Sequence, residues 1–247
     1  MKNLQRLSFA HKRILVLSPH PDDDCIGMGA TLYFLRKNNS LKIFYLTSGW
    51  RGVKGRFSKK EKINLRKKEA ISALKFLGID KKAIKLLALP FYEKGEIGFE
   101  DIRILAEEIK RFQPQVIFTS GKEKDPHLTH EKCWLVLKGA LKNLDFSPEV
   151  YIYRVWKIFK RFDVFFPFGE RTMEIKIKAI QEHKSQLKLK YPKRGIFSLW
   201  EREMRLNRDY GKKLRKMEKL RGKSFLAEVF KTCPNNPEKH CYLRNEE

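Results

Sequence analysis

One short stretch near the amino terminus concentrates residues that could bind a metal or move a proton. His20 is followed by Asp22, Asp23 and Asp24, directly after the apolar run 13–17, which predicts a buried strand. Adjacent carboxylates disfavour one another's ionisation, and a bound cation removes that penalty. A tight turn can aim His20 and Asp23 at one point, and zinc accepts both kinds of ligand. Because a catalytic zinc site uses three protein ligands and one open position, two ligands here predict a third elsewhere.

Helix capping is the competing interpretation of the same stretch. Residues 25–37 follow it and are typical of a helix, and acidic side chains stabilise the amino terminus of a helix. Capping accounts for one aspartate and partly for a second, but it gives His20 no role. The metal interpretation is favoured, and capping stays open as the alternative.

A second pair of candidate ligands follows a later strand. His127 and His130 have the same spacing as His20 and Asp23, and they come after the apolar run 116–119. Parallel strands bring such loops to the same edge of a sheet. Either pair alone is ordinary, since an isolated HxxH is often a pair of surface histidines. Two pairs at the carboxyl ends of predicted strands are harder to explain by chance, so the second loop is expected to supply the missing ligand.

The elements that must position these residues alternate between strand and helix. This order predicts a Rossmann-like, mostly parallel α/β sheet with helices on both faces. After it, the aromatic and basic stretch 150–168 predicts an antiparallel hairpin at the sheet edge, followed by a helical extension. We expect residues 1–230 to form one domain and residues 231–247 a tail. The predicted strands are 13–17, 41–47, 84–89, 116–119 and 150–156, and the predicted helices are 26–38, 58–77, 99–112, 131–144, 173–186 and 198–219.

Composition indicates a globular chain with an unusual charge. Of 247 residues, 42% are hydrophobic and 34% are charged, which is typical of a folded domain rather than a disordered one. The net charge of +25 favours an anionic partner, although solvated basic helix faces at 59–68 and 212–223 would produce the same charge. Four scattered cysteines exclude a disulfide scaffold. For Cys233, His240 and Cys241 we prefer a simple tail to a small metal clip.

The sequence also bears on location in the cell. The amino terminus is polar and basic, unlike a signal peptide, and no long uncharged apolar run is present. We therefore expect a cytoplasmic protein, with peripheral contact at a membrane surface left open. The stretch 150–168 suits a membrane interface, but core strands with a basic outer face are preferred.

The motifs together resemble a known family. Pro-His-Pro-Asp-Asp at 19–23 with a later HxxH is similar to the zinc-dependent PIG-L/LmbE-like N-deacetylases, which remove acetyl from N-acetylglucosaminyl groups. Two positions depart from the family pattern: Asp24, where Glu is more frequent, and Leu128-Thr129, where many members have Pro-Asp. Further matches are Thr47-Ser48-Gly49, Arg66 with Glu69 and Leu77-Gly78, Lys178-Ala179-Ile180 with His183 to Gln186, and a weaker one at 227–230.

The resemblance implies a role for each site residue. His20, Asp23 and His130 would bind one Zn²⁺ per chain, with Fe²⁺ as the alternative metal. Asp22 would be the general base, and His127, as an imidazolium, would stabilise the oxyanion and protonate the leaving amine. The chemistry agrees independently. Amide hydrolysis needs an activated water and a polarised carbonyl, which zinc supplies, and a carboxylate that does not bind the metal must accept the water proton.

Four further positions are candidates for supporting roles. Arg51 and Arg66 could bind sugar hydroxyls or a substrate phosphate, and surface ion pairs are the alternative. Asp125 could orient a histidine or cap its own loop. His183 with Ser185-Gln186 is interpreted as structural.

These observations predict a hydrolase that removes acetyl from an N-acetylglucosaminyl or related N-acetylamino sugar of a glycoconjugate. The basic charge suggests that the substrate is anionic or lipid-linked. A metal-dependent phosphoesterase and a basic nucleic-acid-binding protein are the alternatives. Phosphoesterases more often assemble two metals, and no nucleic-acid-binding motif is present, so no nucleic-acid partner is expected. A dinucleotide site is disfavoured because Gly27 and Gly29 follow the aspartates and no GxGxxG occurs.

Overall fold

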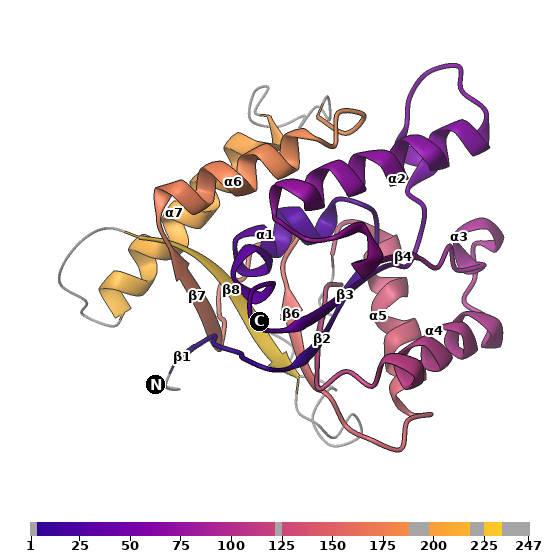
Figure 1. Ribbon diagram of the computed structural model, residues 1–247, viewed down its shortest axis with the longest axis horizontal. Coiled ribbons are helices and arrows are strands. Elements are labelled where there is room, and N and C mark those ends of the chain that lie inside the picture. Colours follow the sequence, from indigo (N-terminus) through magenta and orange to yellow (C-terminus); the bar gives the residue numbers. More distant parts are fainter. Residues whose placement is uncertain (1–3, 122–124, 188–197, 218–224, 234–247) are drawn as a thin grey trace.

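One eight-stranded sheet runs through the part of the chain that the computed structural model describes, residues 4–121, 125–187, 198–217 and 225–233. The strand order is β1-β7-β8-β6-β5-β2-β3-β4 (Figure 1). Neighbouring strands pair in parallel except β8, which is antiparallel to both β6 and β7. The strands are β1 (Gln5–Arg6), β2 (Arg13–Ser18), β3 (Ser40–Tyr45), β4 (Ile84–Leu86), β5 (Val116–Thr119), β6 (Glu149–Tyr153), β7 (Val164–Phe168) and β8 (Leu226–Cys233).

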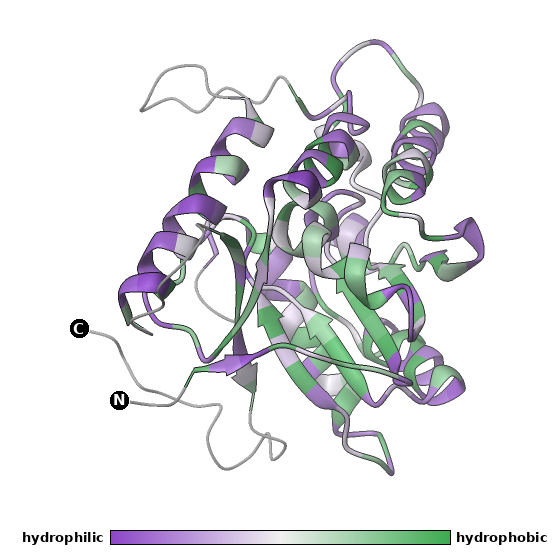
Figure 2. Cartoon of the chain, turned by 60° about the vertical axis from the view of Figure 1, so that its left-hand side comes forward, coloured by the Kyte–Doolittle hydropathy of each residue, from purple (hydrophilic) through white to green (hydrophobic). Residues whose placement is uncertain are grey.

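Helices cover both faces of this sheet, as predicted (Figure 1). Side chains alternate along β2, so that Ile14 and Val16 pack with α1, α2 and α6 while Leu15 and Leu17 pack with α4 and α5. Figure 2 shows the strands as the most hydrophobic layer and the outer helix surfaces as hydrophilic. The helices are α1 (Asp23–Leu35), α2 (Lys59–Phe76), α3 (Phe91–Lys94), α4 (Phe99–Phe112), α5 (Leu128–Leu141), α6 (Glu170–Gln181) and α7 (Leu199–Met217), with 3₁₀ turns η1 (Trp50–Gly52) and η2 (Lys81–Ala83).

The predicted aromatic hairpin is the part of the fold that is wrong. β6 and β7 both form, but they do not pair with each other, because β8 lies between them. Ala227, Val229 and Phe230 are completely or almost completely buried, and β8 lies in the interior of the sheet. It ends at Cys233, inside the range assigned to the tail. His240 and Cys241 lie outside the described residues.

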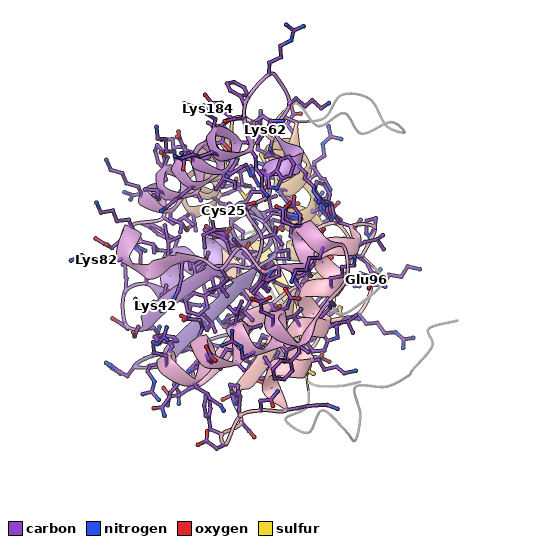
Figure 3. The ribbon with its side chains drawn as sticks, turned by 90° about the vertical axis from the view of Figure 1, so that its right-hand side faces the viewer. Cys25, Lys42, Lys62, Lys82, Glu96 and Lys184 are labelled. Carbon is purple, nitrogen blue, oxygen red and sulfur yellow. The ribbon has the colours of Figure 1, made fainter. Side chains whose placement is uncertain are left out.

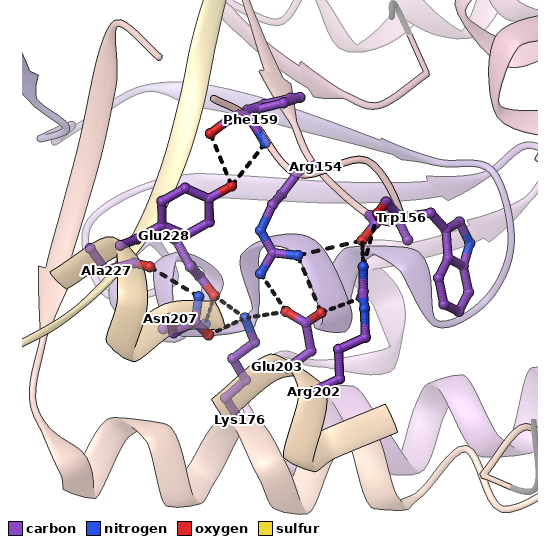
Figure 4. A network of polar contacts seen from close by, with 12 residues as sticks. Arg154, Trp156, Phe159, Lys176, Arg202, Glu203, Asn207, Ala227 and Glu228 are labelled. Carbon is purple, nitrogen blue, oxygen red and sulfur yellow. Dashed lines mark hydrogen bonds and ion pairs between the residues drawn. The ribbon is translucent and has the colours of Figure 1, made fainter. Parts of the chain in front are cut away.

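A buried network of charged side chains fastens α7 and β8 to the rest of the molecule (Figure 4). Glu203 on α7 accepts two hydrogen bonds from Arg154, which follows β6. Lys176 on α6 donates to Asn207 at 3.1 Å and to Glu228 at 2.7 Å. Burying so many charges is tolerable only because each one faces an opposite charge or a hydrogen-bond partner. The network therefore fixes the positions of α7 and β8 relative to α6 and the end of β6.

Glu228 also supports the helix that begins at the acidic turn. α1 is interrupted at Met28, whose backbone angles of −146° and 27° are not helical. Beyond the break, the backbone N–H groups of Ala30 and Thr31 donate to the Glu228 carboxylate at 3.0 and 2.7 Å. A carboxylate at free N–H groups is the arrangement of a helix cap, here supplied by a distant strand.

Most of the positive charge lies at the surface. Figure 3 shows Lys42, Lys62, Lys82 and Lys184 projecting outward while Cys25 lies in the interior. Among the described residues, no helix is both long enough and apolar enough to cross a membrane.

Candidate metal centre

The acidic turn lies at the carboxyl end of β2, one of the central strands. Ser18 Oγ donates to the His20 carbonyl at 2.7 Å and accepts from the Asp24 N–H at 3.2 Å, which folds the chain back on itself. Thr47, after β3, donates its hydroxyl to the Pro19 carbonyl at 2.8 Å. Hydrogen bonds from the ends of two neighbouring strands, β2 and β3, thus hold this turn in place.

Three ligand atoms from the two predicted loops meet at one point. Asp23 Oδ2 lies 3.0 Å from His20 Nδ1 and 3.2 Å from His130 Nε2, and the two ring nitrogens are 3.3 Å apart. Ligands 2.0–2.1 Å from a tetrahedral zinc are about 3.3 Å from one another. The donor set and its spacing are therefore compatible with a single metal ion at this point.

Electrostatics at this point also suit a cation. Burial alone would raise the pKa of Asp23, but the charges and hydrogen bonds of His130 and His20 hold it well below its usual range. Burial would lower the pKa of His130, yet Asp23 and Asp125 raise it to about 10. Because a proton on His130 and a metal ion would satisfy the same carboxylate, the two compete for this position.

His127 lies beside these ligands. Its ring stacks on His130 with centroids 4.9 Å apart and stands edge-on to His20 at 4.7 Å. Nitrogens of the three histidines lie within 4.8 Å of one another, so a triad of histidines is a second conceivable ligand set. The set with Asp23 is preferred because all its distances match tetrahedral spacing. Burial and the neighbouring histidines lower the pKa of His127 to about 4, which disfavours the imidazolium form that the resemblance implies.

Asp22 is separate from the ligand set. It is the residue before α1, yet its side chain makes no capping hydrogen bond. Instead Asp22 Oδ1 pairs with Arg66 Nη2 at 2.9 Å. Asp24 accepts from the Tyr45 hydroxyl at 3.2 Å, and burial raises its pKa to about 7. Helix capping therefore does not explain the Asp22 side chain.

Asp125 combines the two roles weighed for it. Its Oδ1 accepts the backbone N–H of His127 at 2.9 Å and lies 3.3 Å from His130 Nδ1. The first contact shapes the loop and the second orients the ligand ring, which is a frequent arrangement around metal-bound histidines.

The two candidate arginines differ in environment. The Arg66 side chain on α2 is 2% exposed and faces Asp22, whereas the Arg51 side chain is 50% exposed. Arg51 lies over the ring of Tyr92, with Cζ 5.0 Å from the ring centroid. Of the two, Arg51 is accessible to a ligand and Arg66 is not.

The turn after α6 hydrogen-bonds two elements next to the site, α2 and η1. Ser185 donates its N–H and its hydroxyl to Glu69 at 2.7 and 2.8 Å, and Gln186 donates to the Gly52 carbonyl at 3.4 Å. These contacts agree with the structural interpretation. His183 is fully buried, and neither ring nitrogen has a hydrogen-bond partner among the described residues.

Sequence reasoning missed three residues at the rim of the site. Tyr92 faces His20, with ring centroids 6.2 Å apart, and Trp50 donates its indole N–H to Glu93 at 2.8 Å. The usable signal was their position, since Trp50 follows β3 and the other two follow β4, at the same edge of the sheet as the acidic turn.

Comparison with known sequences identifies a family match. The sequence model of the PIG-L family, described as GlcNAc-PI de-N-acetylase, matches residues 15–141. A "glucosamine-6-phosphate deaminase-like protein" of Bacteroides thetaiotaomicron is 25% identical over 242 residues, covering 71% of this chain and 36% of that protein. A Bacillus cereus protein named "Probable N-acetyl-alpha-D-glucosaminyl L-malate deacetylase 2" is 28% identical over 155 residues, covering 58% and 67%. The chain thus spans little more than a third of the first relative.

Solved structures share the fold. N,N'-diacetylchitobiose deacetylase of Pyrococcus horikoshii has a TM-score of 0.64 at 22% identity, covering 91% of this chain and 84% of that one. The 4-carboxy-2-hydroxymuconate hydratase GalB of Pseudomonas putida has a TM-score of 0.72 at 18% identity, covering 96% and 98%. One fold therefore carries two different reactions, so the reaction must be argued from the site.

Proposed function

The chain belongs to the PIG-L family, and on that premise we propose that it is a metal-dependent hydrolase that removes acetyl from an N-acetylglucosaminyl or related N-acetylamino sugar of a glycoconjugate. The observation that carries the proposal is the convergence of Asp23 Oδ2, His20 Nδ1 and His130 Nε2 within 3.0–3.3 Å of one another. Asp22 directly precedes Asp23 in the chain, and its carboxylate is not used for capping.

The metal ion, zinc with iron as the alternative, would be held by His20, Asp23 and His130 and would supply Lewis acidity toward water and the amide carbonyl. Of the two carboxylates beside Asp23, Asp22 is the one that accepts the proton of the attacking water, because Asp24 is fully buried and its carboxylate accepts the Tyr45 hydroxyl. Arg66 holds Asp22 in place for this step through the contact at 2.9 Å.

His127 acts on the carbonyl oxygen. A neutral imidazole can donate one N–H hydrogen bond, and such a donor stabilises the negative charge that develops on the oxygen. Because burial and the neighbouring histidines lower the pKa of His127 to about 4, we assign it the neutral form, which donates a hydrogen bond but does not act as the general acid. The proton that reaches the leaving amine is therefore the one that Asp22 took from water, so Asp22 serves first as base and then as acid.

The test is acetate release from a panel of N-acetylglucosamine conjugates, with chelator and then with zinc or iron added back. We expect release that stops with chelator, returns with one metal ion per chain and is absent in Asp22→Asn. Asp145→Asn, an exposed aspartate away from the site, is the matched control and should keep full activity. Absence of acetate from every conjugate, despite one bound metal ion, would contradict the proposal. A phosphate monoester and an unsaturated acid in the same panel test the phosphoesterase and hydratase alternatives.

A further inference from the structure

Three hydrogen-bond donors at the rim of the site meet at one carboxylate. Trp50 Nε1 and Lys59 Nζ both contact Glu93 Oε1, at 2.8 and 3.0 Å, and Arg51 Nη2 lies 3.9 Å from Glu93 Oε2. The donors come from η1 and from the first residue of α2, and Glu93 comes from α3. Although burial acts against it, these donors lower the pKa of Glu93, so the carboxylate is ionised at neutral pH.

The cations here outnumber the one carboxylate. Arg51, Lys59 and Lys62 surround the ring of Trp50, with their charged atoms 5.7, 5.6 and 5.9 Å from its centroid. The nearby Glu61 is engaged by the Ser58 hydroxyl and N–H at the start of α2. Three like charges near one ring repel one another, and even with Glu61 counted beside Glu93 the cations stay in excess by one. The cluster retains a positive charge that an additional anion would stabilise.

The cluster lies next to the metal centre. Tyr92 connects the two, because its ring is 6.2 Å from the ring of His20 and 5.0 Å from Arg51 Cζ. A sugar ring that presents its acetamide to His20 can therefore extend a substituent toward Arg51.

We propose that Trp50, Arg51 and Lys59 form a subsite for an oxyanion substituent of the substrate, a phosphate or a carboxylate, and that Glu93 occupies this subsite until the substrate displaces it. The inference rests on the proposed function, since it names the class of substrate that the same site selects. Glu93 thereby competes with the substrate for the same hydrogen-bond donors.

Displacement of Glu93 requires little free energy. The side chains of Arg51, Lys59 and Glu93 are 50%, 51% and 42% exposed, and ion pairs this exposed are weak because water screens them. A phosphate carries more charge than one carboxylate and offers more acceptor oxygens, so it competes well for the same donors.

The experiment compares N-acetylglucosamine 6-phosphate and N-acetylglucosamine 1-phosphate with the neutral methyl glycoside. We expect Arg51→Gln to lower kcat/KM for at least one phosphorylated substrate about tenfold more than for the neutral one. Glu93→Gln is expected to raise the same ratio for that substrate by a few fold, because the competitor is gone. Lys142→Gln, an exposed change away from the rim, is the control for net charge.

The outcomes separate the subsite from the reaction. Equal losses on charged and neutral substrates in Arg51→Gln, or no gain in Glu93→Gln, would overturn the subsite. If no substrate is deacetylated, calorimetric binding of the phosphorylated and neutral sugars still decides the matter. Tighter binding of the phosphate that Arg51→Gln abolishes supports the subsite while the proposed function fails, and equal binding of both sugars removes the subsite.

Discussion

Arg66 Nη2 lies 2.9 Å from Asp22 Oδ1, and both side chains are buried. Gly49, with a φ of 63°, closes over the guanidinium, because a Cβ there would lie 3.0 Å from Arg66 Nε. The arginine that the sequence offers as a substrate contact is thus enclosed against the proposed base. The buried position of Arg66 therefore favours a role in positioning Asp22 over a role in binding substrate.

A positioning role for Arg66 has a kinetic signature. Arg66→Lys keeps the charge but loses the planar fork, so Asp22 is held less well. We expect kcat to fall about 10-fold to 100-fold with little change in KM, since hydrogen bonds to charged groups are worth roughly 1.5–3 kcal/mol. Steady-state kinetics on the best substrate checks this. A raised KM at unchanged kcat would show that Arg66 binds substrate instead.

The ligand assignment is tested by metal content alone. His130→Ala and Asp23→Ala each remove one atom of the set and are expected to lose most bound metal, whereas Asp22→Asn retains one ion per chain. Elemental analysis after dialysis against zinc gives the ratio directly. Loss of metal from Asp22→Asn would mean that base and ligand have been exchanged in our assignment.

His127 is expected to matter for turnover and not for metal binding. His127→Ala removes the proposed hydrogen-bond donor to the oxyanion, and losing such a donor lowers kcat about 100-fold to 1000-fold. His127→Gln keeps an N–H donor and should recover part of the rate. Metal content equal to that of the unchanged protein is the control, and its loss in His127→Ala would favour the triad of histidines as the ligand set.

Gly27 offers a test of packing behind the site. Alanine normally stabilises a helix by about 1 kcal/mol relative to glycine. Here a Cβ would lie 2.3 Å from Tyr153 Cδ2 and 2.6 Å from the Arg154 carbonyl oxygen, so Gly27→Ala should destabilise the protein by about 1–3 kcal/mol. Gly169→Ala, with nothing within 4 Å, is the matched control in urea unfolding. Equal stability of the two variants would contradict this packing.

His183 predicts a loss of stability in mild acid. Burial lowers its pKa to about 4 in the folded protein, while an unfolded histidine keeps a pKa near 6.5. As pH falls from about 6.5 to 4, the unfolded state takes up a proton that the folded state does not. Stability is therefore complete above pH 6.5 and decreases by about 3 kcal/mol below it. His183→Leu should show a flatter pH profile of unfolding than the exposed control His11→Asn.

Much of the fold is predictable because local patterns carry it. Residues 99–112 place apolar side chains at helical spacing, and α4 has those bounds. The central strands are short apolar runs, and their order along the chain implies parallel pairing. The position of β8 is not local information, since it depends on which distant strands leave a gap. Which lysine of α6 is buried is also not local information. The resemblance points to Lys178, although Lys176 is the buried one.

The site is predictable to the extent that it lies on strand ends. His20, Asp23 and His130 could be brought together from topology and spacing, without distances. The burial of Arg66 could not, because a charged residue on a basic helix gives no sign of facing inward. The lowered pKa of His127 depends on burial and on neighbouring histidines, which only the folded arrangement supplies.

The cap that Glu228 places on α1 has a consequence for how the protein is made. Synthesis delivers residue 228 long after residue 23, so the helix that begins at the acidic turn remains without its distant cap until nearly all the described chain exists. β8 must also take its place between β6 and β7, which both precede it in the chain. Contacts between such distant residues carry a large loop-closure entropy and are slow to form. A chain interrupted before β8 would carry every proposed ligand but would lack the carboxylate that holds the second half of α1.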